Sequence, residues 1–135
     1  MLIAVSSKGD TLEAPMDSHF GRASYFILYD TDQDTFQTLD NRANQEIYEG
    51  AGTKAAQTLF RYNVQALVTP SCGVQAFYAL KSAGIAVYLH RASTVQEAVQ
   101  EFKNRRLVKS SGPGKVSADE SCQGISCVYQ EHQGG

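Results

Sequence analysis

The chain has 135 residues, a formal charge of −2 and an apolar fraction of 42%, which suit one globular domain with a core. The near-neutral charge gives no electrostatic reason to expect nucleic-acid binding, and no apolar run approaches the roughly 20 residues that span a bilayer. The N-terminus shows no charged leader before an apolar stretch, and the three cysteines are an odd number. We therefore expect a cytoplasmic protein with reduced thiols, without nucleic-acid or membrane partners.

The first half of the sequence predicts three strands. Residues 2–5 form a short apolar run that ends in a cluster of turn formers. Residues 25–29 are rich in aromatic and β-branched side chains, and residues 35–39 alternate with a period of two. A polar turn at residues 30–34 joins these two runs, so they predict a β-hairpin.

The second half predicts alternating helices and strands. Apolar residues recur at helical spacing after the glycine turn at residues 50–52, and two further helices follow strands of their own. The predicted segments are a helix over 55–62, a strand over 65–69, a helix over 76–83 capped by Gly84, a strand over 85–89, and a helix over 95–102 capped by Ser93 or Thr94. The order β-β-β-α-β-α-β-α indicates an α/β fold whose second half has parallel strands and right-handed crossovers.

The composition changes at residue 108. Residues 110–114 are linker-like and no periodicity follows them, so the sequence predicts a domain over 1–107 and a flexible tail over 108–135. The tail nevertheless holds Cys122, Cys127 and His132, which a linker does not require.

The segment Asp17-Ser18-His19-Phe20-Gly21-Arg22 is the most informative one for function. It ends a long loop after the first strand, and long loops in small domains are often functional. It combines an imidazole, which is a metal ligand, with a permanent cation. These residue types favour an anionic or metallic ligand.

A second loop is expected to face the same crevice. We expect the first strand to pair with the strand over 65–69, and loops at the carboxyl ends of neighbouring parallel strands share a binding edge. His19 and Arg22 would come from the first loop, and Cys72 and Gly73 from the second.

The turn containing Gly50 and Gly52 adds to this set. It precedes a predicted helix, so its backbone N–H groups would lie at a helix N-terminus, which favours anions.

Three segments carry a resemblance to a known family. The run 19–22, the turn 50–52 leading into Ala55 and Ala56, and the run 83–88 are similar to the dinitrogenase iron–molybdenum cofactor biosynthesis family over residues 1–107. The resemblance implies a ribonuclease H-like α/β fold without nuclease chemistry. It also implies carriage, storage or assembly of an iron–sulfur or molybdenum/iron–sulfur cluster, with cluster donor or acceptor proteins as partners. By this resemblance His19 contacts the cluster and Arg22 offsets its negative charge.

The sequence departs from the family in the second loop. Relatives usually have a glycine-rich turn with Gly-Pro-Asn there, whereas this chain has a cysteine at position 72. Together with Cys122 and Cys127 it would supply three thiolates, with His19 or His132 as a fourth ligand. Such a set would hold a cubane cluster in one chain, or two chains of a homodimer could share one.

Other interpretations of these residues stay open. Cys72 could be a small buried hydrophobe, the tail thiols could be incidental, and the glycines could serve the backbone alone. His19 could cap a turn, and Arg22 could be a solvated charge. The chain would then be a partner-binding or regulatory module. A thiol-dependent enzyme with Cys72 as nucleophile and His19 as base is a third hypothesis, but nothing in the sequence orients such a histidine, so we expect no enzyme.

Overall fold

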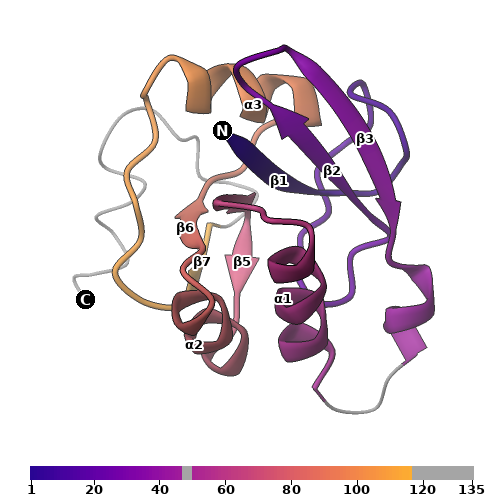
Figure 1. The fold of residues 1–135 in the computed structure, drawn as a ribbon, viewed down its shortest axis with the longest axis vertical. Coiled ribbons are helices and arrows are strands. Elements are labelled where there is room, and N and C mark those ends of the chain that lie inside the picture. The colour runs from indigo at the N-terminus through magenta and orange to yellow at the C-terminus, as the bar shows by residue number, and fades with distance from the viewer. Residues whose placement is uncertain (47–49, 117–135) are drawn as a thin grey trace.

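The computed structural model describes residues 1–46 and 50–116. These residues form a five-stranded sheet, a two-stranded sheet, three α-helices and a short 3-10 helix (Figure 1). Their bounds are β1 Leu2–Ser7, β2 Tyr25–Asp30, β3 Thr35–Asp40, η1 Arg42–Glu46, α1 Ala51–Arg61, β4 Ala66–Thr69, β5 Ser71–Cys72, α2 Val74–Ser82, β6 Ala86–Leu89, α3 Val95–Lys103 and β7 Gly114–Lys115.

The main sheet has the strand order β3-β2-β1-β4-β6, so β1 lies at its centre. The first three strands form an antiparallel meander, whereas β4 and β6 run parallel to β1. Ala4 of β1 lies opposite Leu28 of β2 on one side and Leu67 of β4 on the other. The predicted hairpin, the parallel second half and the pairing of the first strand with the strand over 65–69 are all confirmed.

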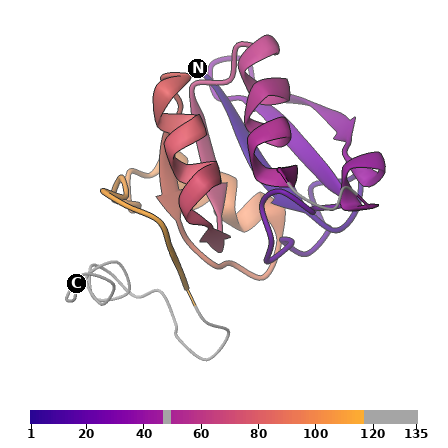
Figure 2. The ribbon, with the colours of Figure 1, turned by 90° about the horizontal axis from the view of Figure 1, so that it is seen from below.

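Helices cover both faces of this sheet (Figures 1 and 2). Because side chains alternate along a strand, Ala4 faces α1 and α2, while its neighbours Ile3 and Val5 face α3. Leu59 of α1 and Val99 of α3 are both at most 1% exposed. Each such buried apolar side chain contributes roughly 1.5–3 kcal/mol relative to an exposed one, so the two layers stabilise the sheet from both sides.

The helix ends follow the predicted capping residues. Gly84, which follows Ala83, the C-cap of α2, has φ +78°, a conformation that glycine adopts without a steric penalty. The side chain of Thr94 accepts a hydrogen bond from the backbone N–H of Glu97 at 3.2 Å, so Thr94 rather than Ser93 is the N-cap of α3.

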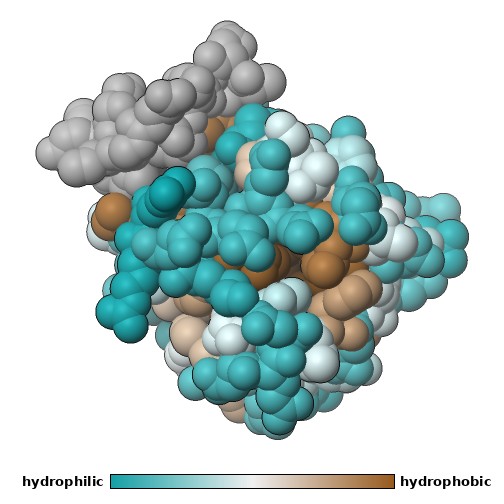
Figure 3. All heavy atoms as spheres, turned by 90° about the horizontal axis from the view of Figure 1, so that it is seen from above, coloured by the Kyte–Doolittle hydropathy of each residue, from teal (hydrophilic) through white to brown (hydrophobic). Residues whose placement is uncertain are grey.

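The outer surface is mainly polar where α3 lies. Seen from above in the orientation of Figure 1, it is mostly hydrophilic, with hydrophobic surface in a hollow near the middle (Figure 3). None of the helices in residues 1–46 and 50–116 is long and apolar enough to cross a membrane.

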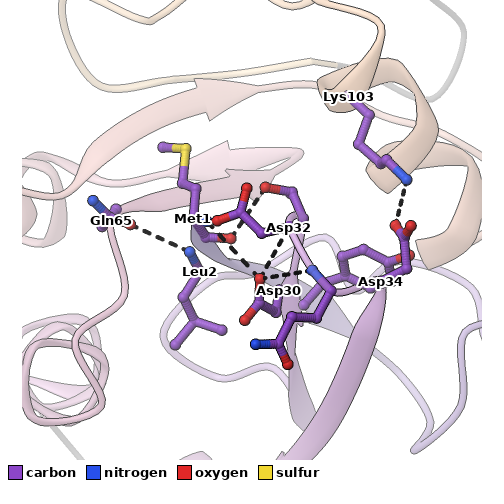
Figure 4. Close-up of polar contacts among 10 residues, drawn as sticks. Met1, Leu2, Asp30, Asp32, Asp34, Gln65 and Lys103 are labelled. Atoms are coloured by element: carbon purple, nitrogen blue, oxygen red, sulfur yellow. Dashed lines mark hydrogen bonds and ion pairs between the residues drawn. The ribbon is translucent and has the colours of Figure 1, made fainter.

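Exposed charges connect the elements at the amino end of β1 (Figure 4). The N-terminal ammonium group pairs with Asp32, and Lys103 of α3 pairs with Asp34 in the β2–β3 turn. These groups are solvent-accessible, so each pair contributes little to stability. The carboxyl edge of β1, β4 and β6 lies at the other end of the sheet. Open α/β sheets usually bind their ligands at this edge.

Part of the chain beyond residue 108, where the sequence predicts a flexible tail, packs on the domain. Residues 114–115 form β7, which pairs with β5, and the N–H of Val116 donates to the carbonyl of Pro70 at 2.8 Å. Val116 is fully buried. This pairing uses backbone groups over two residues, so it leaves no periodic side-chain pattern in the sequence. Residues 117–135 lie outside the described part of the chain.

Arg91 connects Val116, the last described residue, to the loop that carries His19. Its Nε donates to the carbonyl of Val116 at 3.1 Å, and its Nη2 donates to Oγ of Ser18 at 3.2 Å. The planar guanidinium group can make both bonds at once because its donors have a fixed geometry.

Replacing Arg91 with alanine is expected to lower the free energy of unfolding by about 1–2 kcal/mol, because two hydrogen bonds from a charged donor are lost. Hydrogen exchange at the Val116 amide should accelerate at the same time. Arg91→Lys keeps the charge but lacks the planar guanidinium group with its fixed donors, so it should recover only part of the lost free energy of unfolding. An unchanged exchange rate at Val116 in the alanine variant would contradict this role.

Candidate functional site

A cleft of about 430 Å³ opens at the carboxyl edge of the sheet. Three segments border it: the loop after β1, the N-terminal turn of α1, and the turn that leads from β5 into α2. The lining residues are His19, Phe20, Gly21, Arg22, Gly50, Ala51, Gly52, Thr53, Ser71, Gly73, Val74, Gln75 and Ala76. The structure thus brings together five of the residues that the sequence singled out, namely His19, Arg22, Gly50, Gly52 and Gly73.

Two helices begin at this cleft. Gly50 is the N-cap of α1 and Gly73 is the N-cap of α2, and neither helix has a side-chain cap or an acidic residue in its first turn. The first N–H groups of a helix have no acceptor within the helix, and the helix dipole places about half a positive charge there. Both helix ends therefore favour an anion in the cleft.

Close backbone approaches at two glycines shape the cleft walls. A Cβ atom on Gly21 would lie 2.6 Å from the backbone N of Gly52, and one on Gly52 would lie 2.7 Å from Cβ of Ala76. The loop therefore packs directly on α1, and α1 packs directly on α2, at distances that a side chain at either glycine would prevent.

Two buried asparagines fasten the loop to these walls. Asn41 Nδ2 donates to the carbonyls of Gly21 and Ala23 at 3.2 and 2.8 Å. Asn44 Nδ2 donates to the carbonyls of Gly21 and Ala51 at 3.0 and 2.9 Å, which joins the loop to the first turn of α1. Neither asparagine was predicted from the sequence as part of the site. Their only signal is a pair of asparagines just after the third strand, and asparagine is common in turns for local reasons.

The loop presents His19 and Arg22 to solvent at the cleft. Both residues are exposed, and the N–H of His19 donates to Oδ1 of Asp17 at 3.1 Å. The other carboxylate oxygen of Asp17 accepts from the N–H of Ser24, so Asp17 fixes the loop from within. Arg22 Nη1 donates to the carbonyl of Gln45 at 2.8 Å, which holds the guanidinium group at the cleft rim.

Cys72 lies in the core and does not border the cleft, although Ser71 and Gly73 do. It is 3% exposed, and burial raises the pKa of its thiol to about 12. Such a thiol stays protonated at neutral pH, whereas nucleophilic attack requires the thiolate. Cys72 therefore does not share the cleft lining with His19, and the interpretation as a small buried hydrophobe fits its position.

The remaining predicted ligands, Cys122, Cys127 and His132, lie outside the described residues. Within residues 1–46 and 50–116, no group of three or more His, Cys, Asp or Glu side chains is placed to hold a metal ion. The described cleft offers an imidazole, a guanidinium group and helix N–H groups. This set suits an anionic ligand held by charge and hydrogen bonds.

Known proteins share this fold. The chain matches the apo form of the orange protein from Desulfovibrio gigas with a TM-score of 0.82 and 37% identity, covering 84% of this chain and 96% of that one. It matches a NifB-like protein from Thermotoga with a TM-score of 0.71 and 35% identity, covering 80% and 91%. An uncharacterised protein of Methanocaldococcus jannaschii is 25% identical over 97 residues, which are 70% of this chain and 81% of that protein.

The family model described as "Dinitrogenase iron-molybdenum cofactor" matches residues 1–105, which include every described element except β7. This chain therefore belongs to the dinitrogenase iron–molybdenum cofactor family.

Proposed function

We propose that this protein binds an anionic metal–sulfur cluster in the cleft, without catalysing a reaction, for carriage, storage or assembly. The cluster would be of the iron–sulfur or molybdenum/iron–sulfur type. The observation that carries the proposal is that His19, Arg22 and two uncapped helix N-termini border one cleft. Membership of a cofactor-related family supports it, as does the likeness to a protein described in an apo form.

The charges in the cleft suit such a ligand. Sulfide and thiolate groups give these clusters a net negative charge, which the two helix ends and Arg22 would offset. The imidazole of His19 is a metal ligand of intermediate softness, so it could contact an exposed metal directly. We assign the first role to Arg22 and the helix N–H groups, and the second to His19.

We further propose that Cys122, Cys127 and His132 complete the site. The described chain ends at Val116, which Arg91 ties to Ser18, the residue before His19. Six residues of extended chain span at most about 20 Å, so Cys122 has the length to reach the cleft from there. The proposal does not use Cys72, which does not line the cleft.

The sheet supports a ribonuclease H-like assignment without nuclease chemistry. An antiparallel meander lies beside parallel strands that alternate with helices, as the family resemblance implied. A two-metal nuclease needs carboxylates on its central strands, but β1 and β4 have none. This supports a binding role rather than an enzymatic one.

The test is anaerobic reconstitution of the full chain with iron and sulfide, and separately with molybdate and sulfide. We expect a visible chromophore and stoichiometric metal with one of these mixtures. His19→Ala and Arg22→Ala should each weaken retention of the cluster about tenfold, because each removes a direct or charge-assisted contact. Arg61→Ala changes an exposed arginine at the far end of α1 and serves as the matched control, which should load normally.

Thiol variants identify the sulfur ligands in the same assay. Cys122→Ser and Cys127→Ser should reduce cluster retention, whereas Cys72→Ser should not. A chromophore that depends on Cys72 would refute the assignment of tail thiols. No chromophore with either mixture, in a protein that remains folded, would refute the proposed function.

A further inference from the structure

A second concave surface lies between the two helices on the cleft side of the sheet. We call it the α1–α2 groove, and its volume is about 540 Å³. Small side chains from both helices line it, and Phe60, with 58% of its surface exposed, forms part of its wall. The lining residues are Thr53, Ala56, Gln57, Phe60, Arg61, Ala79, Ser82 and Ala83.

The two helices that form the groove carry charge of one sign. Lys54 and Arg61 of α1 and Lys81 of α2 are their charged residues, and neither helix contains Asp or Glu. No ion pair within residues 1–46 and 50–116 involves these three cations. On the other face of the sheet, α3 mixes Glu97 and Glu101 with a lysine. The charged side chains of α1 and α2 are therefore all positive, and they complement an acidic partner.

The groove adjoins the cleft. Thr53 borders both cavities, so a molecule in the groove would lie next to the cleft opening. A partner bound there would be close enough to receive or supply what the cleft holds.

We propose that the α1–α2 groove docks another protein through an acidic segment that also carries apolar side chains. An apolar side chain of the partner would pack against Phe60, and its carboxylates would face Arg61. Laying an amphipathic segment into a groove between helices is a recurrent mode of recognition. In assigning this partner the role of cluster donor or acceptor, the inference rests on the proposed function.

The experiment uses the full chain and two labelled helical peptides. One peptide has Leu and Phe on one face and Glu on the other, and the second has Lys in place of every Glu. Fluorescence anisotropy should show binding of the acidic peptide, weakened by added salt, and little binding of the basic one. Phe60→Ser and Arg61→Glu should each weaken binding of the acidic peptide about tenfold, as expected for an aromatic anchor and a contacting charge.

The matched control is Lys109→Glu, which makes a comparable charge change at an exposed residue outside the groove. It should leave peptide binding unchanged, and thermal unfolding of each variant establishes that the fold is retained. Equal binding of both peptides, or binding that is insensitive to Phe60→Ser and Arg61→Glu, would overturn the inference.

Two other occupants of the groove would also overturn it. If Asp119→Asn with Glu120→Gln in the full chain tightens peptide binding, the chain's own C-terminal segment competes for the groove. If the protein self-associates with rising concentration and Phe60→Ser abolishes this, a second copy occupies the groove.

Cluster loading separates this inference from the proposed function. Reconstitution from inorganic iron, molybdate and sulfide requires the cleft but no partner, so Phe60→Ser should load normally. Peptide binding without a chromophore would refute the proposed function alone. A chromophore without peptide binding would refute the groove inference alone.

Discussion

Replacing Gly21 with alanine is expected to destabilise the protein by about 2–3 kcal/mol, near the upper end for overpacking. The new Cβ would lie 2.6 and 2.8 Å from the backbone N and Cα of Gly52, and 3.0 Å from the carbonyl carbon of Ala51. All three atoms belong to the backbone at the start of α1, so no side-chain rotation can relieve the contact. The loop must move away from the helix, which also shifts His19 relative to both helix ends.

The matched control for this variant is Gly73→Ala. Gly73 borders the same cleft, and a Cβ atom on it would meet nothing within 4 Å beyond its chain neighbours. Its φ of −74° is one that any residue adopts. We therefore expect this variant to unfold within about 0.5 kcal/mol of the wild type, as is usual where no contact is changed. Urea unfolding of the two variants at pH 7 measures the difference, and equal stabilities would show that the loop does not depend on its close approach to α1.

Alkaline pH is expected to destabilise the protein through Cys72. Burial raises the pKa of its thiol to about 12 in the folded state, whereas an unfolded cysteine titrates near about 8.5. Between these values the folded state retains a proton that the unfolded state has lost, so stability falls as pH rises through this window. At about 1.4 kcal/mol per pH unit, the expected loss at pH 10 is about 2 kcal/mol.

A comparison with Cys72→Ala isolates this contribution, because the other titrating groups are common to both proteins. At pH 7 the variant differs from the wild type by the effect of the lost sulfur on packing. From pH 7 to pH 10 the difference should shift by about 2 kcal/mol in favour of the variant. Parallel pH dependences would contradict the burial of the thiol. As an independent check, Cys72 should react slowly with iodoacetamide at pH 8 when Cys122 and Cys127 are replaced by serine.

The local elements of this fold were predictable from the sequence because their signals are local. The apolar run over 25–29 and the alternating run over 35–39 indicated the hairpin, since a strand exposes its two faces with a period of two. Helical spacing indicated α1 and α2. Ser93 or Thr94 marked a helix start through hydrogen-bonding capacity, and Gly84 marked a helix end through its backbone freedom.

The approximate position of the cleft was also predictable. Neighbouring parallel strands bring the loops at their carboxyl ends to one edge of the sheet, so topology alone placed His19 and Gly73 together. That argument concerns only the path of the backbone. It is sufficient for glycines and for exposed loop residues, because their position at the cleft does not depend on how a side chain packs.

Some features depend on distances between segments that are remote in the sequence, and only the tertiary structure decided these. Whether Cys72 faces the cleft or the core is set by the side of β5 on which it lies, and a one-residue change of register would reverse it. The pairing of β5 with β7 and the bonds from Asn44 to Gly21 and Ala51 leave no periodic pattern. The sequence by itself determined the five strands of the main sheet, the three α-helices, their order and the loops that meet at the cleft, because these follow from local propensity and chain connectivity. Only the folded structure determined which side chains reach the cleft and which are buried, because burial and close packing depend on contacts among several elements at once.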